Sequence, residues 1–163
     1  MRKDYQLFIF DWNGTLSSGK VAGGEVSSGF ITELFPGVFE TLKTLQERGK
    51  SLAIATAASR SEMQRELKAH GLEQMFSYVM TNTEGPVKPD PFAILEILQR
   101  SDFSPQQTLM IGDTQRDMTM AKQAGVDALG VSYGLRSGEA LRLAGALGVI
   151  DSISALIPWL QKN

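Results

Sequence analysis

The sequence contains no cysteine and only one histidine, His70, among its 163 residues. The lack of cysteine excludes disulfides, a thiolate nucleophile and cysteine-ligated zinc or iron–sulfur sites. A Ser-His-Asp triad would have to include His70. That residue precedes Gly71 at an expected helix end, where no catalytic partner is visible. A structural role is therefore the simpler interpretation of His70.

Long apolar runs and blocks of like charge are also missing. No run approaches the roughly 20 apolar residues that a membrane span needs, and the first residues lead straight into a predicted strand, unlike a signal peptide. The 16 basic and 18 acidic residues give a formal net charge of -2 and are interspersed. We therefore expect a cytoplasmic protein that binds neither nucleic acid nor membranes.

Short apolar runs alternate with segments of helical periodicity along the whole chain. This alternation predicts a parallel sheet with helices on both faces, a three-layer α/β fold, in one domain over residues 1–163. The expected helices cover residues 38–48, 59–69, 92–98, 114–124, 139–146 and 153–160, the last interrupted by Pro158. The expected strands are Leu7–Phe10, Leu52–Ala55, Phe76–Met80, Thr108–Ile111, Ala128–Val131 and Val149–Ile150.

One segment departs from this alternation. Residues 17–33 are rich in glycine and serine, with only isolated valines, which predicts a mobile loop or a short hairpin. The segment directly follows the first predicted strand, so it could form a flap over a site at the end of that strand.

Polar residues follow several predicted strands. Leu7–Phe10 runs directly into Asp11, Leu52–Ala55 into Thr56, and Thr108–Ile111 into Gly112 and Asp113. The carboxyl ends of parallel strands share one edge of a sheet, and ligands of α/β proteins bind at that edge. These three side chains can therefore converge although they are far apart in sequence.

Such a set suits phosphate chemistry with Mg²⁺. Asp11, Asp113 and the backbone carbonyl of Asn13 could hold the cation, and Asp11 could attack phosphorus as a carboxylate nucleophile. Thr56 and the backbone N–H of Ala57 could bind phosphoryl oxygens, and Lys88 would add a positive charge. Simpler alternatives remain open: Thr56 ends a strand, Lys88 lies on the surface, and Asp117 caps a helix with Thr114.

These residues resemble the four ordered motifs of the haloacid dehalogenase superfamily. The motifs are Asp11-Trp12-Asn13-Gly14-Thr15, Thr56 after an apolar strand, Lys88-Pro89, and Gly112-Asp113-Thr114-Gln115-Arg116-Asp117. Within this superfamily the residue sequence is similar to the phosphoglycolate phosphatase-like branch in four short segments: Phe35-Pro36-Gly37-Val38, Lys88-Pro89-Asp90-Pro91, Ala124-Gly125-Val126 and Ser132-Tyr133-Gly134. The match spans nearly the whole chain apart from residues 17–33.

The resemblance implies a Rossmann-like core and Mg²⁺-dependent phosphoryl transfer through an aspartyl-phosphate. It makes Asp11 the nucleophile, Asp113 a metal ligand, and Thr56 and Lys88 the phosphate contacts. It also implies that Thr15 orients Asp11 and that Asp117 is a supporting carboxylate.

Two departures from the family pattern change these expectations. The family's phosphatases carry a general acid/base Asp where this chain has Asn13, so we expect weakened hydrolysis of ordinary monoesters. Relatives also insert a helical cap domain after the first motif, whereas here only residues 17–33 fill that interval. The site should then be open to a phosphorylated substrate, small molecule or macromolecule. Either the substrate is large, such as a phosphoprotein, or a neighbouring subunit of a homo-oligomer covers the site, or the cap has been lost or deleted.

Two other functions compete with an attenuated phosphatase. One is a catalytically inactive protein that binds phosphate or a partner. The other is phosphonate or carbon–halogen cleavage. Phosphonate-cleaving relatives use a lysine from the cap, which this chain lacks. Dehalogenases do without the metal that Asp113 and Asp117 indicate, so both of these reactions are disfavoured.

Overall fold

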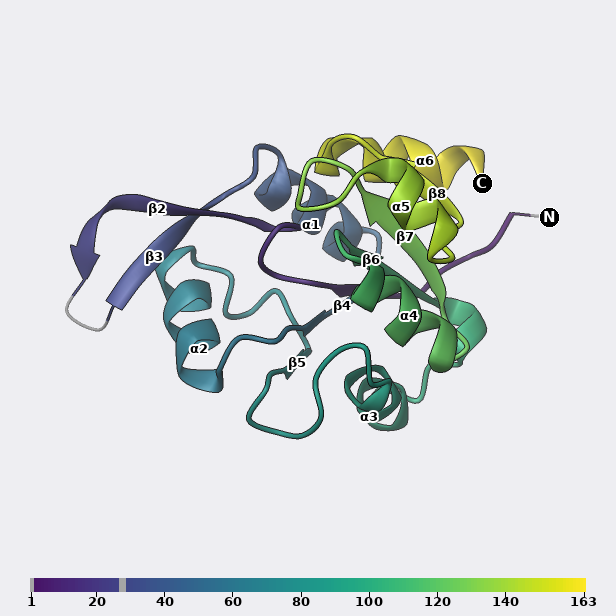
Figure 1. Cartoon of the computed structure of the whole chain (residues 1–163), viewed down its shortest axis with the longest axis horizontal. Coiled ribbons are helices and arrows are strands. Elements are labelled where there is room, and N and C mark those ends of the chain that lie inside the picture. Colours follow the sequence, from purple (N-terminus) through teal and green to yellow (C-terminus); the bar gives the residue numbers. More distant parts are fainter. Residues whose placement is uncertain (1, 27–28) are drawn as a thin grey trace.

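The computed structural model describes residues 2–26 and 29–163, with side chains at 22–29 left aside. Its centre is a six-stranded parallel sheet in the order β5-β4-β1-β6-β7-β8 (Figure 1). The strands are β1 (Leu7–Phe10), β4 (Ser51–Ala55), β5 (Tyr78–Met80), β6 (Thr108–Gly112), β7 (Asp127–Val131) and β8 (Gly148–Ile150). The predicted parallel α/β sheet is therefore confirmed, with β1 at its middle.

Helices alternate with these strands and cover both faces of the sheet. They are α1 (Val38–Glu47), α2 (Arg60–Ala69), α3 (Phe92–Ser101), α4 (Gln115–Gln123), α5 (Gly138–Leu143) and α6 (Leu156–Lys162), with short 3-10 turns at Pro105–Gln107 and Ile153–Ala155. Apolar side chains from α1, α2 and α6 pack on one face, and those from α3, α4 and α5 pack on the other. This is the three-layer, Rossmann-like arrangement that the sequence predicts.

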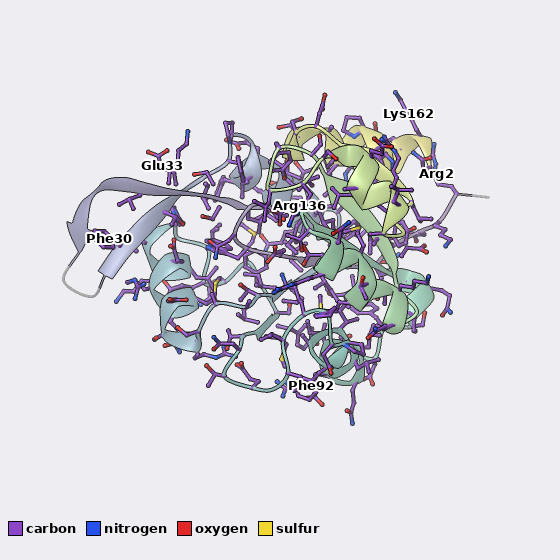
Figure 2. The ribbon with its side chains drawn as sticks, viewed as in Figure 1. Arg2, Phe30, Glu33, Phe92, Arg136 and Lys162 are labelled. Atoms are coloured by element: carbon purple, nitrogen blue, oxygen red, sulfur yellow. The ribbon has the colours of Figure 1, made fainter. Side chains whose placement is uncertain are left out.

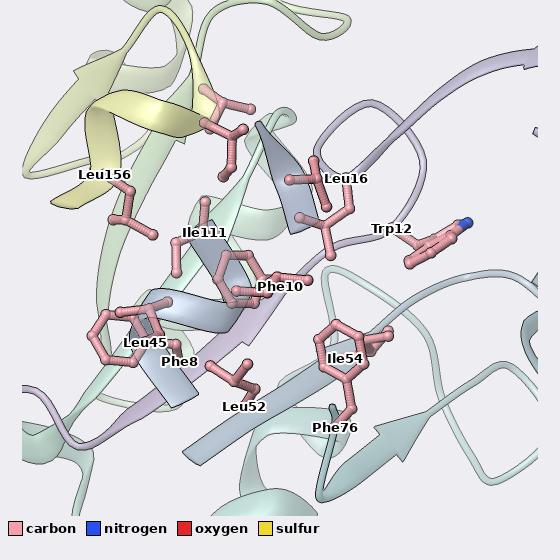
Figure 3. Packing of buried hydrophobic residues seen from close by; sticks show 14 of the residues in the cluster. Phe8, Phe10, Trp12, Leu16, Leu45, Leu52, Ile54, Phe76, Ile111 and Leu156 are labelled. Atoms are coloured by element: carbon pink, nitrogen blue, oxygen red, sulfur yellow. The ribbon is translucent and has the colours of Figure 1, made fainter. Parts of the chain in front are cut away.

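The central strand shows why the core has two halves. Phe8 and Phe10 of β1 lie in the cluster that α1 and α6 cover, whereas Leu7 and Ile9 lie in the cluster that α3 and α4 cover. All four side chains are buried because neighbouring side chains of a strand point to opposite faces and both faces are covered. Figure 3 shows the first cluster, where Phe8 and Phe10 pack among Leu45, Leu52 and Ile111 (Figure 3).

The glycine- and serine-rich segment forms a two-stranded hairpin, the second of the two predicted alternatives, and the hairpin is longer than expected. Strand β2 (Ser17–Val26) pairs antiparallel with β3 (Gly29–Leu34), and the pairing has two irregularities. The hairpin projects beyond the sheet past α2 (Figure 1). Between β1 and α1 the described residues therefore form strands and no inserted helical domain.

Three smaller expectations were wrong. Pro158 lies in the first turn of α6, where a missing N–H costs little, so it does not interrupt that helix. Leu95, which the helical spacing of residues 92–98 assigns to the apolar face of this helix, is 48% exposed, and that face of α3 is instead centred on the fully buried Ile94 and Ile97. Helix α5 stops at Leu143, short of the predicted end at Ala146. Among the described residues, no helix is long and apolar enough to cross a membrane.

Candidate active site

Asp11 lies at the carboxyl edge of the sheet, directly after β1. The register pairs Phe10 with Ile54 of β4 and with Ile111 of β6. The residues that follow these strands are therefore neighbours at the same edge. Asp11 is 6% exposed, and its Oδ1 accepts a hydrogen bond from the backbone N–H of Trp12 at 2.7 Å.

Three buried carboxylates meet at this edge. Oxygens of Asp11, Asp113 and Asp117 all lie within 4.8 Å of one another. Asp113 follows β6 and Asp117 lies in the first turn of α4, so the fold brings together residues that are about 100 positions apart in sequence. The first two are the pair that the strand ends predict to converge.

Lys88 supplies a positive charge within this acidic group. Its Nζ lies 2.5 Å from Asp11 Oδ1 and 2.8 Å from Asp117 Oδ1, and the lysine side chain is only 9% exposed. Burial lowers the pKa of Lys88, but Asp11 and Asp117 together raise that pKa above its ordinary value. Lys88 is therefore a buried, charged lysine and not one on the open surface.

The charges of the buried groups do not balance. Burial raises the pKa of Asp11 well above its ordinary value; Lys88 lowers that pKa, and Asp117 raises it. Three carboxylates face one ammonium here, and carboxylate oxygens are the donors that Mg²⁺ prefers. A divalent cation at this cluster would offset the excess negative charge and favour the ionised form of Asp11. The residues present therefore fit Mg²⁺.

Asp113 is held by contacts from two loops. Its Oδ1 accepts from the hydroxyl of Thr15 at 3.4 Å, and its Oδ2 accepts from the backbone N–H of Leu135 at 3.0 Å. Tyr133 in turn donates to the carbonyl of Thr15 at 2.8 Å. The hydroxyl of Thr15 therefore contacts Asp113, in place of the expected orienting contact with Asp11.

Glycines make this close packing possible. A Cβ on Gly14 would lie 2.1 Å from Asp113 Oδ2, and a Cβ on Gly134 would lie 2.3 Å from the carbonyl oxygen of Gly14. A Cβ on Gly112 would lie 2.4 Å from the side chain of Asp117. Any larger residue at these three positions would push the carboxylates apart.

Thr56 and Ala57 follow β4 and line the same cavity as Asp11 and Lys88. The cavity measures about 360 Å³, and Asn13 and Arg116 also border it. The hydroxyl oxygen of Thr56 accepts from the N–H of Ala58 at 3.1 Å, so its hydrogen remains available to a ligand. Thr56 thus ends its strand, as the simpler alternative has it, and also faces the cavity.

Asp117 likewise combines the two roles that the sequence left open. Its Oδ2 accepts from the N–H of Thr114 at 3.0 Å and from the hydroxyl at 2.9 Å, which completes a capping box at the start of α4. Its Oδ1 forms the ion pair with Lys88. One carboxylate therefore stabilises a helix end and contributes charge to the site.

Three further residues with polar or aromatic side chains lie outside this cavity. His70 ends α2, where its Nε2 lies 2.7 Å from the carbonyl oxygen of Thr32. Trp12 is 1% exposed and packs in the core. Arg136 is exposed on the loop after β7 (Figure 2). None of these three residues lines the cavity that contains Asp11.

The sequence reasoning missed two sets of supporting contacts. Glu84 fixes the loop that carries Lys88, because its carboxylate pairs with Arg60 and accepts from the N–H of Thr81 at 3.0 Å. Glu66 of α2 attaches the hairpin, accepting from the N–H of Thr32 at 3.1 Å and from its hydroxyl at 2.9 Å. Both glutamates lie on segments without a motif, and only the fold shows their partners.

Comparison with known proteins agrees with this architecture. The model of the haloacid dehalogenase-like hydrolases matches residues 25–131, a range that includes Thr56, Lys88, Asp113 and Asp117 but not Asp11. A crystal structure of a predicted phosphoglycolate phosphatase from Haemophilus somnus superposes with a TM-score of 0.83 at 20% identity, covering 96% of this chain and 98% of that chain. At this identity the superposition shows a shared fold.

Relatives of higher identity carry one name. A phosphoglycolate phosphatase of Vibrio cholerae is 34% identical over 128 residues, and one of Pseudomonas putida is 33% identical over 129 residues. Each match covers 78% of this chain, but 57% and 47% of those proteins, so the chain spans about half the length of the relatives it matches. By the family match and these relatives together, the chain belongs to the haloacid dehalogenase-like hydrolases.

Proposed function

We propose that the protein is a Mg²⁺-dependent phosphomonoester hydrolase that acts through an aspartyl-phosphate on Asp11 and is attenuated by Asn13. The observation that carries the proposal is the cluster of Asp11, Asp113 and Asp117, two of which pair with the buried Lys88, beside a cavity that Asp11, Lys88 and Thr56 line. A buried cluster with excess negative charge is costly to fold, and binding a cation and a phosphoryl group gives it a use.

Asp11 is the nucleophile in this proposal. Its Oδ1 is held by Lys88 and by the N–H of Trp12, which leaves the other carboxylate oxygen to attack phosphorus. A bond then forms between that oxygen and phosphorus while the ester P–O bond breaks, and the leaving alkoxide takes its proton from solvent water. Water afterwards attacks the aspartyl-phosphate, releasing inorganic phosphate and restoring the carboxylate.

Asp11, Asp113 and the backbone carbonyl of Asn13 would hold Mg²⁺. The cation would supply Lewis-acid stabilisation of the phosphoryl oxygens. Thr56 and the backbone N–H of Ala57, which line the same cavity, would bind the phosphoryl oxygens, while Lys88 neutralises charge between Asp11 and Asp117. Asp117 keeps Lys88 in place through its ion pair.

Asn13 weakens the reaction because an amide neither protonates a leaving alkoxide nor activates water. Asn13 is exposed and borders the cavity, so it lies where a general acid would act. General acid–base catalysis contributes about 10²- to 10⁴-fold. The expected enzyme is therefore slow toward ordinary alkyl phosphates and less impaired toward esters with good leaving groups.

Hydrolysis of p-nitrophenyl phosphate tests the proposal. We expect turnover with Mg²⁺, loss of turnover with chelator, and no turnover above background for Asp11→Asn. Asn13→Asp should raise kcat for an alkyl phosphate about 10²-fold or more, and for p-nitrophenyl phosphate by less. Failure of Asn13→Asp to raise either rate would show that residue 13 is not the acid/base position.

Asn13 also supports a second candidate, a catalytically inactive protein that binds phosphate or a partner. The same assay separates the two functions. An inactive binding protein would turn over nothing and still bind inorganic phosphate in the presence of Mg²⁺, and calorimetry would detect that binding. The phosphoglycolate activity named for the relatives is not carried over, because this chain matches only 57% and 47% of those proteins.

A further inference from the structure

A second, larger cleft adjoins the catalytic cavity. It measures about 800 Å³ and lies between the base of the hairpin and the loop after β7. Its walls include Lys20 and Glu33 of the hairpin, Phe35, and Tyr133 to Leu135 of the loop. Glu33 is seen on the hairpin in Figure 2. A cleft of this volume accommodates a ligand far larger than a phosphate group.

The cleft shares part of its wall with the catalytic cavity. Asn13 and Thr114 border both spaces, and Asp113 lies at the boundary of the larger one. In an in-line displacement the leaving oxygen lies opposite the nucleophile, so the leaving group points away from the buried Asp11 toward the exposed Asn13. The leaving group would therefore enter a space that Asn13 borders.

The lining of the cleft is mainly apolar. The rings of Phe35 and Tyr133 pack edge to face with centroids 4.6 Å apart. Leu135 is 70% exposed and lines the cleft, so its side chain is accessible to a ligand there. The hairpin contributes one cation, Lys20, and one anion, Glu33, to the walls. The cleft therefore offers no net positive charge to attract an anionic leaving group, whereas an apolar leaving group could bury apolar surface against its walls.

A competing space lies on the other side of Asn13, between the hairpin and α2. It measures about 350 Å³ and is bordered by Phe30 and by two carboxylates, Glu62 and Glu66. Phe30 is 54% exposed on the hairpin (Figure 2). This space is less than half as large as the cleft, and its two carboxylates outnumber its one cation, Arg65.

We propose that the 800 Å³ cleft binds the leaving group of the substrate and selects a bulky, uncharged group with an aromatic or aliphatic body. The inference rests on the proposed function and names its substrate class. Because Leu135 also donates its N–H to Asp113, a leaving group that covers its side chain lies directly beside the metal-binding carboxylate.

Phenyl phosphate and 2-naphthyl phosphate test the proposal, because their leaving groups differ in apolar area but little in acidity. We expect kcat/KM with Mg²⁺ to favour the naphthyl ester about fivefold, mainly through KM. Leu135→Ser should bring the ratio close to one. Two matched variants, Phe30→Ser in the competing space and Leu143→Ser on α5, should keep the ratio, since both remove an exposed apolar side chain outside the cleft.

Each other result has a distinct meaning. A wild-type ratio near one, or an unchanged ratio in Leu135→Ser, overturns the assignment of the cleft while leaving the phosphatase intact. Loss of the naphthyl preference in Phe30→Ser would instead show that the leaving group binds in the space between the hairpin and α2. If the wild type hydrolyses neither ester, the proposed function itself fails and the inference fails with it.

Discussion

The catalytic edge and the hairpin side of the molecule are built in opposite ways. At the catalytic edge, Asp11, Asp113 and Asp117 are at most 6% exposed, and glycines without room for a Cβ surround them. On the hairpin side, a long two-stranded element rests on α2 through Glu66, and a Cβ on Gly19 would meet nothing within 4 Å.

This difference separates two tasks within one site. The phosphoryl group and the cation have the same shape for every substrate, so a rigid, crowded pocket suits them. The leaving group varies between substrates, and the walls around it are exposed and tolerate change. Substitutions at the edge should therefore affect stability and metal binding together, whereas substitutions on the hairpin should affect neither strongly.

The largest expected effect is that of Lys88→Met. Without this ammonium, three buried carboxylates face one another, and metal-free protein should lose about 3–5 kcal/mol of unfolding free energy. Added Mg²⁺ should restore part of the loss by binding the folded state. Urea unfolding with and without Mg²⁺ measures both effects. Lys20→Met on the hairpin is the control, and its unfolding free energy should stay within about 0.5 kcal/mol of wild type. Equal losses of stability in the two variants would contradict the difference between the catalytic edge and the hairpin side.

Gly134→Ala should have the next largest effect. Its Cβ would press on the carbonyl of Gly14 and on Asp113, costing about 1–3 kcal/mol and weakening Mg²⁺ binding. Gly19→Ala has open space and only the cost of its positive φ of 75°, about 1 kcal/mol. Mg²⁺ titration calorimetry separates the two variants. Unchanged Mg²⁺ affinity in Gly134→Ala would show that Asp113 does not depend on this close packing.

Glu66→Gln should loosen the hairpin without affecting the chemistry. The amide keeps one acceptor but weakens the hydrogen bonds to Thr32, which should cost about 1 kcal/mol. Hydrogen exchange at the Thr32 amide should become faster while hydrolysis of p-nitrophenyl phosphate stays within about twofold. Glu73→Gln, on the exposed surface after α2, should change neither quantity. A large fall in turnover would mean that the hairpin takes part in phosphoryl transfer.

The smallest effect lies at the opposite, amino-terminal edge of the sheet and appears only in alkali. The phenol of Tyr5 donates to Asp127 at 2.7 Å, and burial followed by this hydrogen bond raises the pKa of Tyr5. A raised pKa stabilises the fold below the unfolded-state pKa of about 10, and this stabilisation is lost as pH rises above it. Wild type should therefore lose more stability than Tyr5→Phe between about pH 10 and 11 in thermal unfolding. Parallel losses in the two proteins would show that Tyr5 is not the group responsible.

The sequence predicts the sheet well because each central strand is an apolar run that ends at a polar residue. It predicts the hairpin only as one of two alternatives. Residues 17–34 show no sustained alternation of apolar and polar side chains, and of the described side chains at 17–21 and 30–34 only Ser17 and Ile31 are buried. Glycine and serine are then equally typical of a loop. The prediction that Pro158 interrupts the last helix was wrong for a different reason. A proline disrupts a helix interior but not its first turn, and the sequence does not show where the helix begins.

The site was predictable to the extent that it depends on strand ends. Asp11, Thr56 and Asp113 follow strands of known direction, so their convergence follows from topology. The contact of Thr15 with Asp113 and the role of Glu66 were not predictable, because each depends on distances between segments far apart in the chain. Motifs identify which residues meet, whereas side-chain pairing requires the fold.

The double use of Asp117 has a consequence for experiment. One carboxylate oxygen of Asp117 accepts from the amide of Thr114, the N-cap residue of α4, and the other pairs with the ammonium group of Lys88. A change at Lys88 therefore reaches the Thr114 amide through the carboxylate of Asp117. The Thr114 amide, at the border of the cavity, is therefore a built-in NMR reporter: its chemical shift should follow ligand titrations without any attached probe.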